Sequence, residues 1–174
     1  MAIPSRKSLP ENIARPRRTF FVTTKTHMGK HLLQSDRHAA LLIDVLRSCV
    51  VDGHFRIHDF VVMPNHLHLL IALSEDMTVE KAMQFVKGRF SYRAKRELGL
   101  AGEVWQRGFS EIRAEGRENL ERYRRYIARN PLSAGLIRDG ELFPWCFETL
   151  RKQKAQGLKP SSLESAIGTT EVMP

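Results

Sequence analysis

The stretch VVMPNHLHLLIAL, Val61 to Leu73, constrains the fold more than any other part of the chain. Apolar and β-branched residues on both sides of Pro64-Asn65 indicate two strands, Phe55–Met63 and His66–Leu73. Because the link between them is so short, the strands are expected to pair as an antiparallel hairpin.

Two histidines interrupt the apolar pattern of the second strand. His66 and His68 are two residues apart, so both side chains point to the face opposite Leu67, Leu69 and Ile71. Those three residues are expected to pack against helices. At a rise of about 3.3 Å per residue, the two histidine Cβ atoms lie roughly 7 Å apart, which lets both rings reach one metal ion. Two histidines on the solvent face of a sheet would give the same pattern, so a metal site needs a third ligand.

The remaining elements alternate around this hairpin. The pattern predicts a strand at Arg18–Thr26, helices that Asp36 and Thr78 cap, a weaker strand at Trp105–Ala114, and a helix from Arg117 to Asn130 that Pro131 breaks. This order predicts an α+β fold: a ferredoxin-like βαββαβ antiparallel sheet with helices packed on it, plus a C-terminal helix that carries tyrosines.

The two ends of the chain differ in composition from its centre. Residues 1–17 contain three prolines and scattered basic residues, which predicts a flexible basic arm. Residues 18–150 are expected to form a single domain, and residues 151–174 turn polar and small, which predicts a disordered tail. No apolar run approaches the roughly 20 residues of a membrane span. Cys49 and Cys146 fit neither a zinc site nor a disulfide framework, which favours a reducing cytoplasm.

The charge balance indicates a polyanionic partner. Lys and Arg total 28 against 19 Asp and Glu, giving a formal net charge of +9. Such an excess favours nucleic acid. Arg17 and Arg18, where the arm meets the first strand, are candidate DNA contacts.

The helix NLERYRRYIARNP separates two tyrosines by its geometry. Leu120, Tyr123 and Ile127 form one apolar stripe, so Tyr123 is expected in the core. Tyr126 lies roughly 90° away from that stripe. Asn130 follows Tyr126 by four residues and shares its face, so the helix could present a nucleophile and a polar metal ligand together.

Arginines surround Tyr126, and their positions suggest a phosphate-binding surface. Arg122, Arg125 and Arg129 are candidate DNA contacts. A tyrosine hydroxyl is a poor nucleophile near neutral pH because its ordinary pKa is about 10. Nearby arginines and a divalent cation would lower that pKa and neutralise charge on the reacting phosphate. A solvated amphipathic helix with a surface tyrosine is the alternative interpretation.

Three motifs together resemble the single-tyrosine HUH transposases, which are IS200-like. MPNHLHLL resembles their His-hydrophobic-His motif, while VWQRGF (residues 104–109) and YIARNPLSAGL (residues 126–136) resemble the REP-associated tyrosine transposase branch. The resemblance covers roughly residues 18–147. After FPW that branch usually has serines, whereas this chain has Cys146-Phe147-Glu148, which puts DNA recognition by that segment in doubt.

The resemblance implies a metal-dependent DNA transesterase. Such proteins cleave and rejoin single-stranded DNA beside hairpins of repetitive extragenic palindromes, through a covalent 5′-phosphotyrosine that frees a 3′-OH. Carried over to this chain, Tyr126 is the nucleophile, His66 and His68 bind Mg²⁺ or Mn²⁺, and Asn130 matches the third ligand. Mn²⁺ is expected to bind better, because Mg²⁺ prefers oxygen ligands. The branch also implies a monomer rather than a dimer, acting on the nucleoid in the bacterial cytoplasm.

Two other functions fit parts of the pattern. A non-catalytic nucleic-acid-binding module would keep the basic surface but would have no need of the histidine pair beside Tyr126. A metal-dependent phosphodiesterase using an activated water would cleave DNA without a covalent intermediate and would survive Tyr126→Phe.

Overall fold

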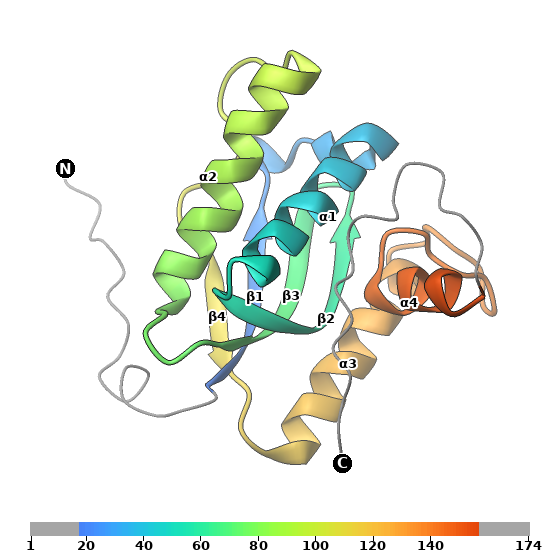
Figure 1. Cartoon of the computed structure of the whole chain (residues 1–174). Helices are drawn as coiled ribbons and strands as arrows, with labels where there is room; N and C mark the ends of the chain where they lie inside the picture. Colours follow the sequence, from blue (N-terminus) through green and yellow to red (C-terminus); the bar gives the residue numbers. More distant parts are fainter. Residues whose placement is uncertain (1–17, 157–174) are drawn as a thin grey trace.

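The computed structural model describes residues 18–156, so the predicted arm, including Arg17, and the tail beyond residue 156 lie outside the described residues. The elements are β1 (Thr19–Lys25), α1 (Asp36–Val51), β2 (Phe55–Met63), β3 (His66–Leu73), α2 (Val79–Leu98), β4 (Ser110–Arg113), α3 (Gly116–Ser133) and α4 (Phe147–Ala155), with short 3-10 turns at His27–Gly29 and Leu32–Gln34. Figure 1 shows their arrangement.

The four strands form one antiparallel sheet in the order β2-β3-β1-β4. The β2–β3 hairpin has the strand limits expected from the Pro64-Asn65 turn, and β1 then lies between β3 and β4. Helices α1 and α2 cover one face of the sheet, and α3 packs on the other (Figure 1). The predicted ferredoxin-like fold class is therefore confirmed.

The alternation along β3 divides its residues between the two faces. Leu67, Leu69 and Ile71 are fully buried in the large core that α1 and α2 cover. Leu70 packs instead with residues of α3, and the face of His68 is therefore the α3 face. The hydrophobic alternation alone fixes this placement, because shifting the register by one residue would move every leucine to the wrong face.

Helix ends agree only partly with the sequence prediction. The Thr78 side chain accepts a hydrogen bond from the Lys81 amide and caps α2 as expected. Asp36 is not the cap of α1 but its first helical residue, and Ser35 holds the capping position. The Asp36 carboxylate, in the first turn of α1, still complements the helix dipole.

The predicted break at Pro131 was wrong. Helix α3 nevertheless continues through Pro131 to Ser133, although proline lacks the amide donor of a regular helical residue. Pro131 is buried, and its packing outweighs the local cost. Asn130 consequently lies within a formed helical turn, whose last bond runs from the Ala134 amide to the Asn130 carbonyl at 3.0 Å.

The segment after α3 returns to the free edge of β2. The Val62 amide donates to the Trp145 carbonyl at 2.9 Å, and Val61 pairs with Cys146. Cys146 then occupies the capping position of α4. Because α4 runs to Ala155, ordered structure extends past residue 150, where the domain was predicted to end. None of the helices within residues 18–156 is long and apolar enough to span a membrane.

Candidate functional site

Three polar side chains from two elements converge on one point. His66 and His68 come from the start of β3, and their Nε2 atoms lie 3.1 Å apart. Asn130 reaches the same point from α3, with its Nδ2 atom 3.2 Å from His68 Nε2. His68 and Asn130 are 62 residues apart in the sequence, but they are in direct contact because α3 packs across this face of the sheet.

Both imidazole rings are held at their other nitrogen. Asn65 Oδ1 lies 2.7 Å from His66 Nδ1, and an amide oxygen can only accept, so Nδ1 carries the proton. Thr23 Oγ1 lies 2.7 Å from His68 Nδ1, and Thr23 is the direct β1 partner of His68. When Nδ1–H of His68 donates to this hydroxyl, both rings present an Nε2 lone pair at the point of convergence.

The surroundings keep both histidines neutral. Burial lowers the pKa of His68 to about 3, and the neighbouring His66 and Lys25 charges add to this effect. The pKa of His66 is also lowered, mainly by burial and then by Lys25, against a hydrogen bond with Asn130. An imidazole binds a metal only when it is neutral. The pair is therefore in its ligating form at neutral pH.

The geometry fits a divalent cation. Two ligands about 2.1 Å from a shared ion and at right angles to each other lie about 3.0 Å apart, close to the 3.1 Å between the Nε2 atoms. Half a turn of the Asn130 amide brings Oδ1 to the place of Nδ2 and supplies an oxygen ligand. Within residues 18–156 no three His, Cys, Asp or Glu side chains gather around one point. The polar groups that converge here, two neutral imidazoles and one amide, carry no net charge, so an ion bound among them would keep its full charge.

The two tyrosines of α3 occupy different environments. Tyr123 is 8% exposed and stacks on Phe21 with ring centroids 4.7 Å apart, as the apolar stripe predicted. Tyr126 is 51% exposed. Its ring meets the edge of His68 at 5.2 Å and of Phe21 at 5.6 Å. A half-exposed tyrosine ring thus packs against His68, one of the two converging histidines.

Comparison with known proteins identifies the family. Residues 20–130 match the family described as "Transposase IS200 like", a span that contains His66, His68, Tyr126 and Asn130. The chain belongs to the IS200-like transposase family.

Individual relatives and solved structures are also similar to this chain. The chain is 28% identical over 147 residues to the REP-associated tyrosine transposase of Escherichia coli (strain K12), covering 84% of this chain and 77% of the relative. Its fold matches a REP-associated tyrosine transposase solved with a REP hairpin, with a TM-score of 0.66, 22% identity, and coverage of 98% and 93%. A transposase of Deinococcus radiodurans R1 matches with a TM-score of 0.50, 17% identity, and coverage of 71% and 95%.

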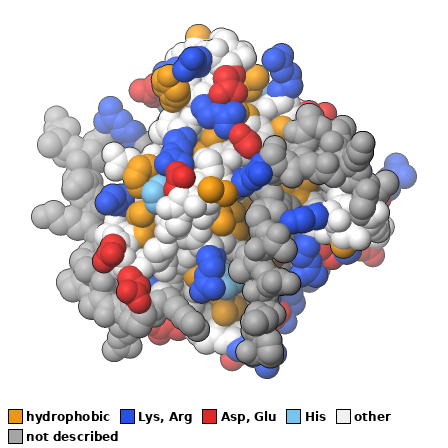
Figure 2. Space-filling model, in the orientation of Figure 1, with side chains coloured by type: hydrophobic (Ala, Val, Ile, Leu, Met, Phe, Trp, Pro, Cys, Tyr) orange, Lys and Arg blue, Asp and Glu red, His pale blue; other side chains and the backbone are white. Residues whose placement is uncertain are grey.

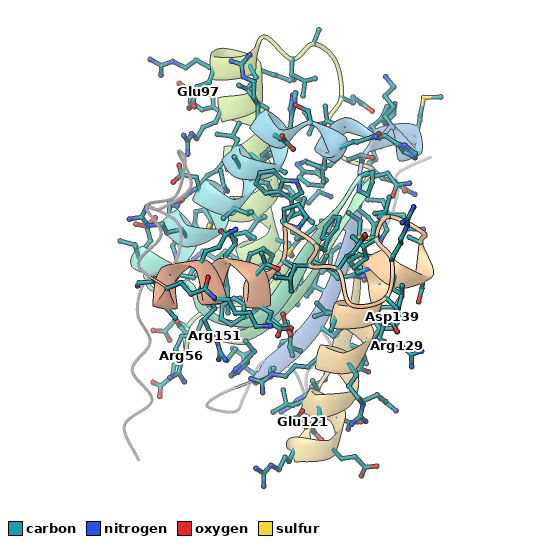
Figure 3. The ribbon with its side chains drawn as sticks, turned by 90° about the vertical axis from the view of Figure 1, so that its right-hand side faces the viewer. Arg56, Glu97, Glu121, Arg129, Asp139 and Arg151 are labelled. Carbon is teal, nitrogen blue, oxygen red and sulfur yellow. The ribbon has the colours of Figure 1, made fainter. Side chains whose placement is uncertain are left out.

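The arginines predicted to contact DNA in this transposase divide into two groups. Arg18 is 4% exposed, and its guanidinium donates to the Met77 carbonyl at 2.7 Å and to the Glu75 carbonyl. It is a structural residue of the core, so its predicted place on the DNA-binding surface was wrong. Arg125 and Arg129 are exposed, and Arg129 points away from the sheet (Figure 3).

Arg122 has a specific neighbour on the helix. Its guanidinium donates to the Tyr123 hydroxyl at 3.2 Å and lies over the Tyr123 ring, 5.1 Å from the centroid. Arg122 therefore contacts the buried tyrosine of α3. This contact helps to hold the buried tyrosine in place.

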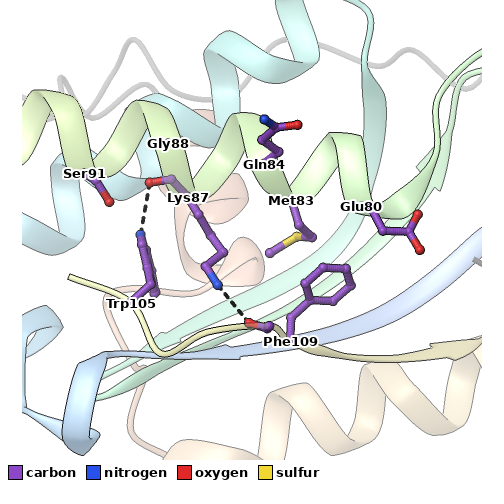
Figure 4. A pocket seen from close by; sticks show the side chains of 9 residues that line it. Glu80, Met83, Gln84, Lys87, Gly88, Ser91, Trp105 and Phe109 are labelled. Carbon is purple, nitrogen blue, oxygen red and sulfur yellow. Dashed lines mark hydrogen bonds between the residues drawn. The ribbon is translucent and has the colours of Figure 1, made fainter. Parts of the chain in front are cut away.

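Basic residues of α2 serve the fold of this transposase. Lys and Arg side chains on the face of α1 and α2 are interspersed with Asp and Glu (Figure 2). Arg89 pairs with Asp52 at 2.6 Å, and Arg93 pairs with Asp44 and Glu97. Lys87 donates to the carbonyls of Gln106 and Gly108, both at 2.8 Å, across a shallow pocket (Figure 4).

Trp105 lines the same pocket and confirms its predicted role as a core anchor. It is 8% exposed, packs near Phe90, and donates from its indole nitrogen to the Lys87 carbonyl at 3.2 Å. Met83, Trp105 and Phe109 line the pocket and also belong to or pack against the core under α1 and α2. The pocket therefore lies on the sheet face opposite His68 and Tyr126.

Sequence reasoning missed the two residues that orient the histidines. Asn65 was interpreted only as part of a turn, although its place directly before His66 was a usable signal. Thr23 carried no signal of its own, because its contact with His68 depends on the β1–β3 register.

Proposed function

We propose that the chain cleaves and rejoins single-stranded DNA beside hairpins of repetitive extragenic palindromes, with Tyr126 as the nucleophile. Membership of the IS200-like family supports transposase chemistry. The E. coli relative is named a REP-associated tyrosine transposase, and the matching solved structure holds a REP hairpin, which together favour the same class of DNA.

One observation supports the proposal most strongly. The exposed Tyr126 ring packs edge-on against His68, 5.2 Å between centroids, while Asn130 of the same helix contacts the same imidazole. Nucleophile and ligand groups are therefore held against one another by a single helix. A binding module would need neither the neutral histidine pair nor an exposed tyrosine beside it.

The proposed reaction exchanges one phosphodiester for another. The Tyr126 oxygen attacks the scissile phosphorus and loses its proton to solvent. The bond from phosphorus to the 3′-oxygen breaks, and that oxygen takes up a proton to become a 3′-OH. The DNA remains joined through its 5′-phosphate to Tyr126, so the reverse attack by a 3′-OH reseals a strand without any external energy source.

His66, His68 and Asn130 would hold the divalent cation, Mg²⁺ or Mn²⁺. When bound, the ion supplies Lewis-acid stabilisation of charge on the phosphate oxygens. The nitrogen ligands favour Mn²⁺ over Mg²⁺. Asn65 and Thr23 orient the two rings through their Nδ1 atoms, which would leave both Nε2 atoms available to the ion, and Phe21 stacks on the His68 ring at 5.4 Å.

All four proposed site residues come from one chain. His66, His68, Asn130 and Tyr126 contact each other without a second copy, through the packing of α3 on its own sheet. This arrangement supports a monomer as the active species.

Labelled oligonucleotides test the proposal. Single strands spanning palindromes near the source gene are labelled at the 5′ or 3′ end, incubated with protein and Mn²⁺ or Mg²⁺, and separated on a denaturing protein gel. A metal-dependent labelled protein band should appear only with the 3′ label and should vanish with Tyr126→Phe. The matched control is Tyr123→Phe, which removes the neighbouring hydroxyl of the same helix and should keep the band. Cleavage that survives Tyr126→Phe without an adduct would instead establish a phosphodiesterase.

A further inference from the structure

The loop that follows β1 combines a strained backbone with an exposed apolar side chain. Met28 has φ +54°, and it is the single non-glycine residue with positive φ within residues 18–156. Its side chain is 81% exposed. A left-handed conformation is uncommon for methionine, and such strain persists only when the surrounding structure imposes it. Neither feature stabilises the fold.

The surrounding structure does impose it. The Thr26 hydroxyl donates to the Lys30 carbonyl at 2.6 Å, and the Gly29 and Lys30 amides close two further turns. The His27 amide bonds the Val104 carbonyl at 2.9 Å, and the His27 ring pairs with Glu103 at 3.0 Å. Met28 is therefore held out into solvent by a rigid frame.

This loop lies beside His66 and His68. Lys25 and His66 are the last pair of the β1–β3 ladder, so the loop begins where the histidines begin. The Thr26 amide donates to the Asn65 carbonyl at 2.9 Å. A Cβ built on Gly29 would lie 3.9 Å from the Asn65 side-chain amide, which orients His66. Gly29, the neighbour of Met28, therefore lies close to the side chain that orients His66.

The charge around Met28 suits a nucleic-acid strand. Lys25, Lys30 and His31 are exposed, and the sequence from Thr19 to Ser35 contains no Asp or Glu. The acidic residue facing the loop is Glu103, which the His27 ring engages. Exposed lysines around one apolar, polarizable side chain match the needs of an unpaired nucleotide, whose phosphates are anionic and whose base has an apolar face.

We propose that the β1–α1 loop, residues 25–31, seats the unpaired nucleotides that flank the hairpin, with Met28 packed against a base next to the scissile phosphate. The inference rests on the proposed function, because that function places single-stranded DNA at the histidines. Backbone strain at Met28 then serves to present the side chain before DNA arrives, which lowers the ordering cost of binding.

Four variants separate base contact from folding. Met28→Gly and Met28→Asn both relieve the left-handed strain and remove the apolar side chain, since these two residues tolerate that conformation. Met28→Leu keeps an apolar side chain. Val51→Ala is the matched control, because Val51 is 72% exposed and ends α1, which begins after the loop and runs to the opposite end of the sheet.

Binding is measured in the Tyr126→Phe background, so that no chemistry follows. The probes are the hairpin alone and the hairpin with its single-stranded flank. We expect Met28→Gly and Met28→Asn to weaken binding of the flanked hairpin about 3- to 10-fold, near the lower end of the range for an aromatic platform, and to leave the bare hairpin unchanged. Met28→Leu and Val51→Ala should bind the flanked hairpin like the parent. Relief of strain should raise Tm by about 2–4 °C in the Gly and Asn variants.

Each contrary result has a definite meaning. Unchanged affinity of the Gly and Asn variants for the flanked hairpin would overturn the proposal, and so would an equal loss on the bare hairpin. If the wild-type chain forms no adduct while binding of the flanked hairpin still depends on Met28, the proposed strand transfer is wrong and the proposed contact of Met28 with the flank stands. If adducts form and the Met28 variants bind the flanked hairpin like the parent, only the proposed contact of Met28 with the flank is wrong.

Discussion

Replacing Thr23 by valine should weaken metal binding without disturbing the fold. Thr23 lies opposite His68 in the β1–β3 ladder, and its hydroxyl oxygen is 2.7 Å from His68 Nδ1. Valine has nearly the same shape and suits a strand. It leaves Nδ1–H without its acceptor, so the ring gains by moving the proton to Nε2, where it blocks the lone pair that would bind the ion.

The size of the effect follows from this contact. Losing a partner that orients a histidine ligand typically lowers metal affinity about 10- to 100-fold, equivalent to about 1.4–2.7 kcal/mol. The unfolding free energy should fall by only about 1 kcal/mol, the usual net contribution of one hydrogen bond. The two readouts therefore separate a positioning role from general destabilisation.

Free Mn²⁺ can be followed by electron paramagnetic resonance as protein is titrated. Thr23→Ser keeps the hydroxyl and should bind Mn²⁺ like the wild type. Ring ¹⁵N shifts of His68 should move from the Nδ1–H to the Nε2–H tautomer in Thr23→Val alone. Equal Mn²⁺ affinity in the wild type and Thr23→Val would refute the reasoning.

Three further predictions follow from the same structure. Asp59→Asn should raise the unfolding free energy at pH 7.5 by about 1–2 kcal/mol, because burial raises the Asp59 pKa to about 6 and its ionisation there opposes folding. The gain should shrink as the pH falls through 6 and disappear near about pH 3, where Asp59 is protonated in both the folded and the unfolded chain. Urea titrations at these two pH values measure the difference. Arg18→Met should lower the unfolding free energy, measured by urea titration, by about 2–4 kcal/mol, because the Met77 carbonyl loses a buried charged donor. The salt dependence of DNA binding should stay as in the wild type. Mn²⁺ and hairpin DNA should strengthen each other's binding to the Tyr126→Phe protein at least about tenfold. The reason is that the proposed ligands are neutral, so the phosphate would supply the negative charge that balances the ion. Calorimetry showing independent binding would count against this.

The hairpin and the division of the tyrosines could be predicted because each depends on local pattern. Pro64-Asn65 interrupts two apolar runs at one point, so the limits of β2 and β3 agree with the prediction. The spacing of Leu120, Tyr123 and Ile127 places Tyr123 against the sheet for the same reason.

Other features depend on contacts far apart in the sequence. The sequence predicts Arg18 as a DNA contact, but its guanidinium donates to carbonyls 57 and 59 residues away, which no local pattern reveals. Pro131 has a local preference to end a helix, and tertiary packing overrides it. The partnership of Thr23 with His68 required the strand order, since β1 and β3 are separated in the chain by α1 and β2.

The most direct test of the account is to locate the covalent bond by mass spectrometry. The chain has three tyrosines, and trypsin separates them, because Arg125 and Arg129 bracket a Tyr126–Arg129 peptide while Tyr123 and Tyr92 fall in others. The protein–DNA adduct is trimmed with nuclease and digested with trypsin. The account predicts a nucleotide on Tyr126 of that peptide, formed only with Mn²⁺ or Mg²⁺. A nucleotide on either other tyrosine, or DNA cleavage with all three peptides unmodified, would contradict it.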